Sequence, residues 1–124
     1  MKRDFTYVDD LVESVTRLIH SIPTPDKNWD ALNPDPASSF APYKIFNVGN
    51  NNTVELIRYI EIIEEKLGLK AIKKLLPIQE GDVPDALADV EDLQKTIDFK
   101  PSTPIEVGVG KFIDWYLDYY KVKL

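Results

Sequence analysis

Arg3 and Asp4 begin a short segment, 3–8, that contains β-branched and aromatic residues. This composition predicts a strand. An arginine at the start of a strand can offer its planar guanidinium to a phosphate group through two parallel N–H donors. The alternative is a solvated charge that binds no ligand, as is common for exposed arginines. The segment is therefore a candidate anion site, with the simpler interpretation left open.

A second candidate site is the turn Gln79-Glu80-Gly81-Asp82. Its amide and carboxylate side chains can hydrogen-bond to the hydroxyl groups of a sugar. Gly81 readily adopts a positive φ, so a plain connecting turn is the alternative.

Other side chains with chemical potential fit structural roles better. Adjacent carboxylates at Asp9 and Asp10 suit acid–base chemistry, yet they stand where a helix begins and favour capping. The single histidine, His20, falls at the end of the same helix, where a surface or capping role is expected. Aromatic residues near the C-terminus can stack on a ring, but their helical spacing favours packing in a core or interface. These aromatic residues are Trp115, Tyr116, Tyr119 and Tyr120.

The composition excludes several classes of site and partner. The 124 residues include no cysteine and one histidine, which excludes disulfides, thiolate nucleophiles and multi-histidine metal sites; no metal is expected. Lys and Arg number 15 against 21 Asp and Glu, which disfavours nucleic acid as a partner. No apolar run approaches the length of a membrane span, and the first residues do not have the pattern of a signal peptide. We expect a cytoplasmic protein with no membrane partner.

The first half of the chain predicts two strands and one helix. Its length suits a single domain, 1–124. After the strand at 3–8, apolar residues at helical spacing predict a helix that starts with Asp10 and Glu13 at capping-box spacing and stops at Pro23. Five of the nine prolines lie in 23–42, which predicts an irregular loop insertion. A second strand is expected at Tyr43–Val48.

The second half predicts mostly helices. A helix is expected over 53–67, with Asn52 and Glu55 at capping spacing and Gly68 at its C-terminal end. Segment 71–78 suits a strand, and a short helix is expected after Asp89.

The last helix carries the clearest start signal, with Thr103 as the predicted N-cap and Pro104 in the first turn. The strand–helix–strand–helix order predicts an α/β fold with a right-handed crossover between parallel strands. Short strands with about four helices cannot form a doubly covered sheet by themselves. The pattern is that of the end of a larger α/β protein.

Four motifs in a fixed order resemble the second half of the extended short-chain dehydrogenase/reductase family. The motifs are Arg3-Asp4-Phe5-Thr6-Tyr7-Val8-Asp9-Asp10, then Pro42-Tyr43-Lys44-Ile45-Phe46-Asn47-Val48-Gly49-Asn50 followed by Val54-Glu55-Leu56, then Leu76-Pro77-Ile78-Gln79-Glu80-Gly81-Asp82-Val83, then Ala88-Asp89. Within that family the chain resembles the nucleotide-sugar epimerases, in particular the UDP-glucuronate 4-epimerases, whose proline-rich insertion matches 23–42. The resemblance covers essentially the whole chain and implies a C-terminal, substrate-binding portion, with the NAD-binding Rossmann core mostly absent.

The resemblance also implies a set of substrate-binding residues. Arg3 matches the family's diphosphate-contacting arginine, and Phe5 matches an aromatic residue near the same group. Val54 matches a position that packs on the nucleotide, and Asp82 matches an acidic residue that contacts the ribose. Gln79 stands where galactose epimerases have a second phosphate-binding arginine, and the glucuronate branch shares the glutamine.

The expected activity belongs to a parent enzyme rather than to this chain alone. The resemblance implies an NAD-dependent 4-epimerase that interconverts UDP-glucuronate and UDP-galacturonate. Tyr7, Tyr59 and Tyr116 are each followed four residues on by a residue other than lysine, and no glycine-rich dinucleotide loop is present. We expect this chain to lack the family's Tyr-x-x-x-Lys pair and other catalytic residues, to bind no cofactor and to be inactive on its own.

The expected partners are a UDP-sugar, the missing N-terminal NAD-binding half and, as a further possibility, a second copy in a homodimer. Two alternatives stay open. The chain can derive from another nucleotide-sugar dehydratase or reductase, or it can be a non-catalytic binding or assembly module.

Overall fold

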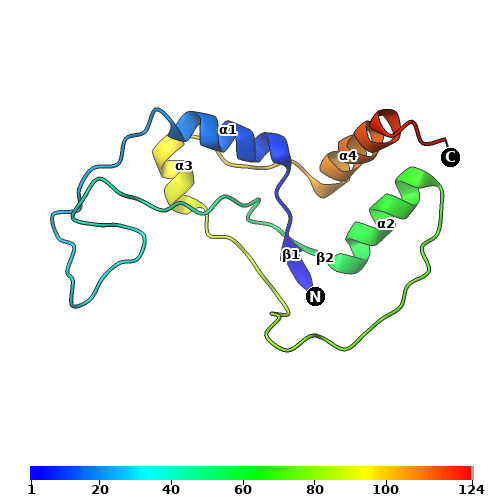
Figure 1. Ribbon diagram of the computed structural model, residues 1–124, viewed down its shortest axis with the longest axis horizontal. Helices are drawn as coiled ribbons and strands as arrows, with labels where there is room; N and C mark the ends of the chain where they lie inside the picture. The colour runs from blue at the N-terminus through cyan, green and yellow to red at the C-terminus, as the bar shows by residue number, and fades with distance from the viewer. Residues whose placement is uncertain (124) are drawn as a thin grey trace.

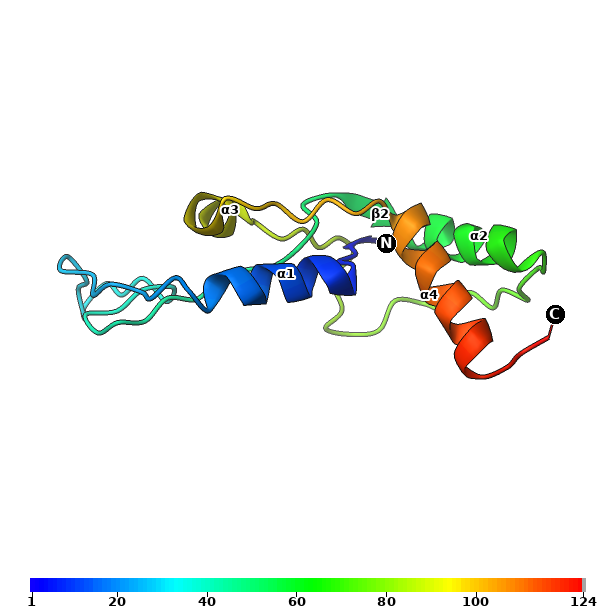
Figure 2. The same ribbon diagram turned by 90° about the horizontal axis from the view of Figure 1, so that it is seen from above.

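Two pairs of helices flank a small two-stranded sheet in the computed structural model, which describes residues 1–123 (Figure 1). The elements are β1 (Lys2–Asp4), α1 (Val8–Leu18), β2 (Thr53–Glu55), α2 (Leu56–Leu67), α3 (Glu91–Ile97) and α4 (Ile105–Tyr119). Both views place α1 with α3 at one end and α2 with α4 at the other (Figures 1 and 2). The expected α/β class, with short strands and four helices, is confirmed.

Strand β1 lies between two segments that are distant in sequence. On one side it pairs with β2 in antiparallel register, with Arg3 opposite Val54. On the other side Lys2 forms a parallel bridge with Asp85, its N–H donating to the Pro84 carbonyl at 2.9 Å. The predicted parallel crossover is therefore wrong, because the neighbouring strand of β1 runs antiparallel to it.

Two predicted strands do not form. In segment 43–48 the pairing within the described residues is one isolated bridge, between Ser38 and Lys44, and segment 71–78 has no pairing partner. Both segments are extended, but no strand edge lies beside them to accept their hydrogen bonds. The ladder instead takes Thr53–Glu55, predicted as helix, where β-branched Thr53 and Val54 favour the extended conformation.

The predicted side-chain caps are also wrong, whereas the predicted C-terminal glycine is confirmed. The N-caps of α1, α2 and α4 are Tyr7, Glu55 and Pro104, none with a side-chain capping bond. The Asp10 carboxylate does not cap its own helix; it accepts hydrogen bonds from the N–H groups of residues 102 and 103, which precede α4. Gly68 ends α2 in the left-handed conformation with φ 67°.

The main apolar core joins α2 and α4. Ile62 from α2 packs with Val109 and Ile113 from α4, each less than a tenth exposed. The surrounding partly buried side chains are Tyr59, Ile63, Leu67, Ile105 and Leu117. This packing fixes α2, whose N-terminal end begins directly after β2 and so holds the sheet in place.

A smaller contact joins α1 and α3. Ser14 is fully buried in α1, and Leu93 in α3 is 1% exposed. Arg17 Nη1 donates to the carbonyls of Ile97 and Asp98, where α3 ends, and its guanidinium lies 4.7 Å from the ring centre of Phe99. In the proline-rich loop between α1 and segment 43–48, the rings of Trp29 and Phe40 lie 5.5 Å apart.

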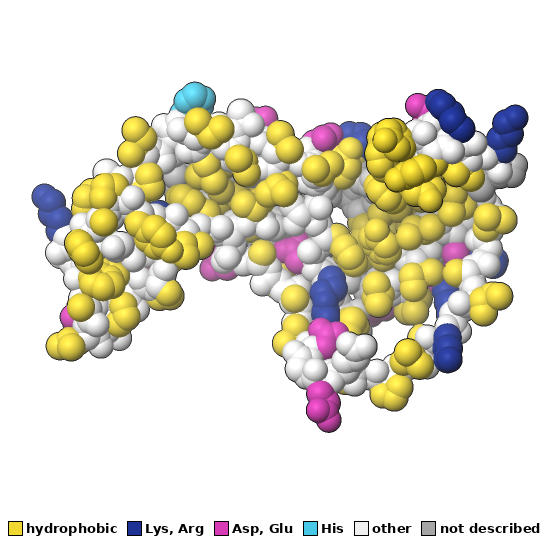
Figure 3. All heavy atoms as spheres, in the orientation of Figure 1, with side chains coloured by type: hydrophobic (Ala, Val, Ile, Leu, Met, Phe, Trp, Pro, Cys, Tyr) yellow, Lys and Arg dark blue, Asp and Glu magenta, His cyan; other side chains and the backbone are white. Residues whose placement is uncertain are grey.

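The molecule exposes far more surface than a compact monomer. Its accessible area is 9470 Å², whereas a compact monomer of 14.2 kDa exposes about 6,800 Å². Apolar side chains cover much of the visible face (Figure 3). The exposed apolar residues of α1 and of the turn after it are Val8, Leu11, Val12, Val15, Ile19 and Ile22. None of the helices in 1–123 is both long and apolar enough to cross a membrane.

Candidate functional site

The two charged residues singled out in the sequence meet in the fold. Arg3 Nη2 donates to Asp82 Oδ1 at 2.8 Å, although the residues are 79 positions apart. Arg3 Nη1 donates to the carbonyls of Lys2 and Pro84, which fixes the guanidinium against the backbone. Asp82 is placed by a tight turn in which its N–H donates to the Gln79 carbonyl and Gly81 has φ 85°. The turn prediction is confirmed at Gly81.

A cavity of about 840 Å³ opens beside this ion pair. Gln79 and Asp82 line it directly, whereas Val54, opposite Arg3 in the sheet, does not line it. The remaining lining residues are Met1, Glu55, Leu56, Ile57, Ile60 and the segment 71–78. The volume falls within the range of cavities that hold small molecules and cofactors, about 300–1,000 Å³.

The charges at this cavity are mixed. Lys73 and Lys74 line it together with the carboxylates of Glu55 and Asp82. The two lysines, together with Arg3, which bonds the lining residue Asp82, give this acidic protein a local supply of cationic donors. Such donors are what a diphosphate needs, since its charge must be met by N–H groups at short range.

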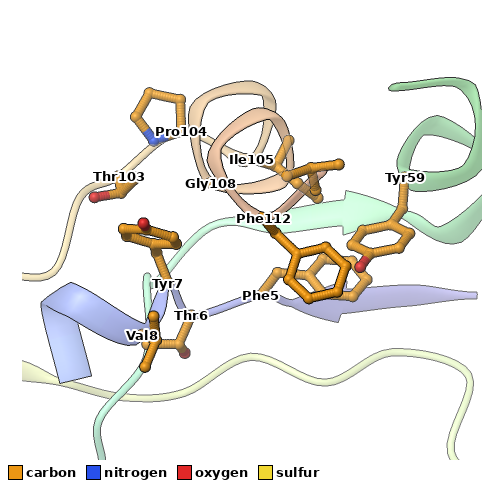
Figure 4. Close-up of a pocket in the computed structure, with 11 residues that line it drawn as sticks. Phe5, Thr6, Tyr7, Val8, Tyr59, Thr103, Pro104, Ile105, Gly108 and Phe112 are labelled. Atoms are coloured by element: carbon orange, nitrogen blue, oxygen red, sulfur yellow. The ribbon is translucent and has the colours of Figure 1, made fainter. Parts of the chain in front are cut away.

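Phe5 lines a different cavity from Gln79 and Asp82. Its ring stacks on Tyr59 with 4.7 Å between ring centres. It lines a smaller cavity of about 220 Å³ between the end of β1 and α4, where Phe112 faces the same two rings (Figure 4). The structure thus gathers Arg3, Gln79, Asp82 and Val54, and separates Phe5 from them.

Tyr7 lines the same small cavity on the side of Gly108 (Figure 4). Burial, together with the neighbouring Asp9 carboxylate, raises the pKa of Tyr7 above its ordinary value of 10.0. This direction does not favour a base, which needs a tyrosine pKa nearer neutrality. The Tyr7 ring packs against Gly108.

One Tyr-x-x-x-Lys spacing does occur, at Tyr119 and Lys123, which corrects the expectation that the chain has none. Tyr119 is the last residue of α4, is 64% exposed and stacks on Trp115. Lys121 has φ 52°, so the helix does not continue to Lys123. The pair lacks the shared helical face that would bring a lysine beside a tyrosine at four-residue spacing.

The other candidate groups do not assemble into a reactive site. Asp9 lies 4.0 Å from Lys111, Asp10 binds backbone N–H groups, and His20 is exposed after α1. The aromatic rings near the C-terminus stack on one another at an exposed surface rather than in a core. Within residues 1–123 no group of three or more His, Asp or Glu side chains could hold a metal ion.

Asp4 is an organising residue that the sequence did not reveal. Its carboxylate accepts hydrogen bonds from the N–H groups of Asn50, Asn51 and Ala88, at 3.0–3.1 Å. A Cβ at Gly49 would collide with Ala88 and with the Asp4 carboxylate, so only glycine fits there. The available signal was the asparagine run at 50–52, since asparagine is frequent in turns. The N–H groups of this turn bind a carboxylate of the protein itself.

Comparison with known proteins places these features in a wider group. A scan against protein-family models finds no match. The chain is 54% identical over 121 residues to Protein CapI of Staphylococcus aureus, covering 98% of this chain and 36% of that protein. It is 42% identical over 127 residues to a probable UDP-glucuronate 4-epimerase of Rhizobium meliloti, covering 98% and 36%. This chain therefore spans about a third of the length of these curated relatives.

The fold has a counterpart among solved structures. MoeE5, in a complex with UDP-glucuronic acid and NAD, superposes with a TM-score of 0.72 over 95% of this chain and 34% of its own. The sequences are 23% identical, so the likeness establishes a common fold. In this comparison too, about two thirds of the longer protein has no counterpart in the 124 residues.

Proposed function

We propose that this chain, which belongs to the extended short-chain dehydrogenase/reductase family of nucleotide-sugar epimerases as a C-terminal part, binds the UDP end of a UDP-sugar. The observation that carries the proposal is the Arg3–Asp82 pair at the edge of the cavity of about 840 Å³. The name of one relative, a probable UDP-glucuronate 4-epimerase, supports UDP-glucuronate as the substrate of the parent enzyme. Inversion at C4 of this sugar gives UDP-galacturonate, the proposed product.

The guanidinium of Arg3 is suited to hold a phosphate in this position. Its contacts with protein oxygens use Nη1 twice and Nη2 once. Of the five N–H donors of arginine, this leaves the Nε donor and one on Nη2. These donors can form charge-assisted hydrogen bonds to phosphate oxygens.

Asp82 and Gln79 suit the sugar hydroxyls of the nucleotide. Asp82 Oδ1 accepts from Arg3 and from the Val83 N–H. The other carboxylate oxygen is then available to accept a hydrogen bond from a ribose hydroxyl. Gln79, three residues earlier on the same turn, offers both a donor and an acceptor to the same ligand.

NAD chemistry is assigned to the part of the parent enzyme that this chain does not span. The sequence contains no Gly-x-x-Gly-x-x-Gly loop, so its residues do not fit a dinucleotide. Catalysis by NAD-dependent epimerases requires that cofactor and a tyrosine base. We therefore infer that the 124 residues bind and orient the nucleotide and do not catalyse epimerisation alone.

The partner of this chain is proposed to be the remaining two thirds of such an enzyme. The exposed apolar side of α1 and the accessible area of 9470 Å² both indicate a surface made to be covered.

Titration of UDP into the isotopically labelled chain, followed by NMR, tests the proposal. The expected result is saturable shifts of the amides around Arg3 and 79–83, with weak affinity because one wall of the site is missing. Uridine without phosphate serves as the control ligand and should shift these amides far less. Shifts confined to other regions, or none at millimolar UDP, would remove the basis for the proposal.

A further inference from the structure

Glu64 is a buried carboxylate whose partners all come from the segment that follows α2. The residue is 4% exposed. Its Oε2 accepts from Lys70 Nζ at 2.8 Å, and its Oε1 accepts from the Ala71 N–H at 3.0 Å. Lys73 Nζ lies 2.6 Å from the same Oε1. One side chain thus gathers three groups from four consecutive residues.

The segment 70–78 has little else to hold it. Each of its residues is exposed, and Ile72 and Leu75 are 101% and 83% exposed. Within residues 1–123, the hydrogen bonds of this segment all end on Glu64. In Figure 1 it follows a wide arc away from α2 toward the turn at 79–82. Apolar burial therefore does not fix its path.

The same segment forms one wall of the cavity assigned to the nucleotide. Residues 71–79 line the cavity from one side, while Leu56, Ile57 and Ile60 of α2 line it from the other. Lys73 belongs to both arrangements, because it lines the cavity and pairs with Glu64. The position of this wall is thus tied to one carboxylate.

We propose that Glu64 is a positioning residue that holds residues 70–74 against α2 and so sets the wall and the lysines of the nucleotide site. The proposal rests on the proposed function in assigning the nucleotide to that cavity. Glu64 itself does not contact the ligand, since it does not line the cavity. It acts through Lys73 and through the path of the backbone at Ala71.

The arrangement differs from an ordinary surface ion pair. Exposed pairs contribute little because water screens the charges. Here the carboxylate of Glu64, a residue of α2, is buried, and three donors from the following segment replace its hydrogen bonds to water. Removing its charge leaves Lys70 and Lys73 without an anionic partner, and the segment is then free to open.

Limited proteolysis with trypsin reports on this segment directly, because Lys70, Lys73 and Lys74 are themselves cleavage sites. For Glu64→Gln we expect cleavage after these lysines to rise about tenfold or more, since cleavage follows the population of the open segment. Cleavage after Lys27, in the proline-rich loop, is the internal reference and should change by less than about twofold.

The matched control is Glu65→Gln. Glu65 is the next residue of α2 and loses an exposed ion pair, to Arg58 at 2.8 Å, whereas the three donors from segment 70–78 bond Glu64. It should cleave like the wild type. Lys70→Gln is a second variant that leaves the core untouched, since the Lys70 side chain is 83% exposed, and it should raise cleavage after Lys73 and Lys74.

Repeating the digestion with UDP separates the two proposals. UDP should slow cleavage of the wild-type segment, and it should protect Glu64→Gln much less. Equal protection of both would overturn the link between Glu64 and the site. No protection of the wild type would count against the proposed function alone, because the cleavage ratios measured without UDP still test the positioning role of Glu64. Unchanged cleavage in Glu64→Gln, or an equal rise at Lys27, would overturn the positioning role.

Discussion

The guanidinium of Arg3 lies 2.8 Å from the carboxylate of Asp82 and is held there by two backbone carbonyls, of Lys2 and Pro84. The pair joins the first strand to a turn 79 residues later. Two of the residues that the sequence suggested for ligand binding therefore form a single unit in the fold. The two side chains carry opposite charges, so substitutions of Arg3 and of Asp82 are expected to have different effects on ligand binding.

Arg3→Lys should weaken UDP binding by about tenfold or more. The guanidinium has enough donors for two carbonyls, Asp82 and a phosphate, whereas the ammonium of lysine has three donors and lacks the planar geometry. The measurement is the UDP affinity by isothermal titration or NMR. Arg58→Lys is the control, since Arg58 lies in ion pairs on α2 and does not line the cavity. Equal losses in the two variants would count against a direct phosphate contact.

Asp82→Asn should distinguish the two halves of the ligand. The variant loses the anionic acceptor for a ribose hydroxyl, so UDP affinity should fall severalfold, by about 1 kcal/mol or more. Pyrophosphate affinity should not fall, because Arg3 is released from its anionic partner. Both ligands are measured by the same titration. A parallel loss for pyrophosphate would contradict this division of roles.

Asp4→Asn should lower the stability of the whole fold. The amide cannot accept as strongly from the N–H groups of Asn50, Asn51 and Ala88, and hydrogen bonds to a charged acceptor contribute about 1.5–3 kcal/mol. Denaturant unfolding measures the change. Asp9→Asn is the control, since Asp9 is exposed and lies 4.0 Å from its nearest cation, and it should be close to neutral.

The segment held by Glu64 should detach only in acid. Hydrogen bonds from Lys70, Lys73 and the Ala71 N–H lower the pKa of Glu64 from 4.5 to about 2. A carboxyl whose pKa is lowered in the folded state stabilises that state fully above its ordinary pKa, and this stabilisation is lost as pH falls from 4.5 toward 2. The Ala71 amide resonance should therefore stay constant from pH 7 to 5 and move below 4. In Glu64→Gln it should show no such transition.

The apolar side of α1 should drive self-association of the isolated chain. Replacing Val15 and Ile19, which are 48% and 70% exposed, with lysine should reduce association measured by sedimentation while helix content stays the same. Thr16→Lys, on an exposed polar position of the same helix, is the control. Association that is unaffected by the double substitution would show that another surface mediates it.

Local patterns predicted the helices better than the contacts between them. The sequence located α2 and α4. It also placed Tyr116 and Tyr120 in a core or interface, and both are more than 40% exposed. The reason is that α4 packs against one helix, α2. The buried face of α4 is therefore narrower than the set of apolar residues along the helix.

The polar features escaped prediction because they depend on partners far away in the sequence. Capping spacing at Asp10 fits a local rule, but backbone N–H groups 92 and 93 residues later compete for the carboxylate. Glu64 was not singled out in the sequence, although it is 4% exposed in the fold. Its burial follows from where the chain turns after Gly68, which helical periodicity does not encode.

A sheet of two three-residue strands is short enough to slide. A shift of one residue would turn Arg3 to the opposite face and carry Lys2 or Asp4 into its place. The Asp4 carboxylate prevents this, because its bonds to 50–51 and to residue 88 are satisfied in one alignment only. In the proposed site, the side chain that faces the ligand is thus selected by Asp4, which lies next to it in the strand, and mutations at Asp4 or Gly49 should alter ligand preference although neither residue is proposed to contact the ligand.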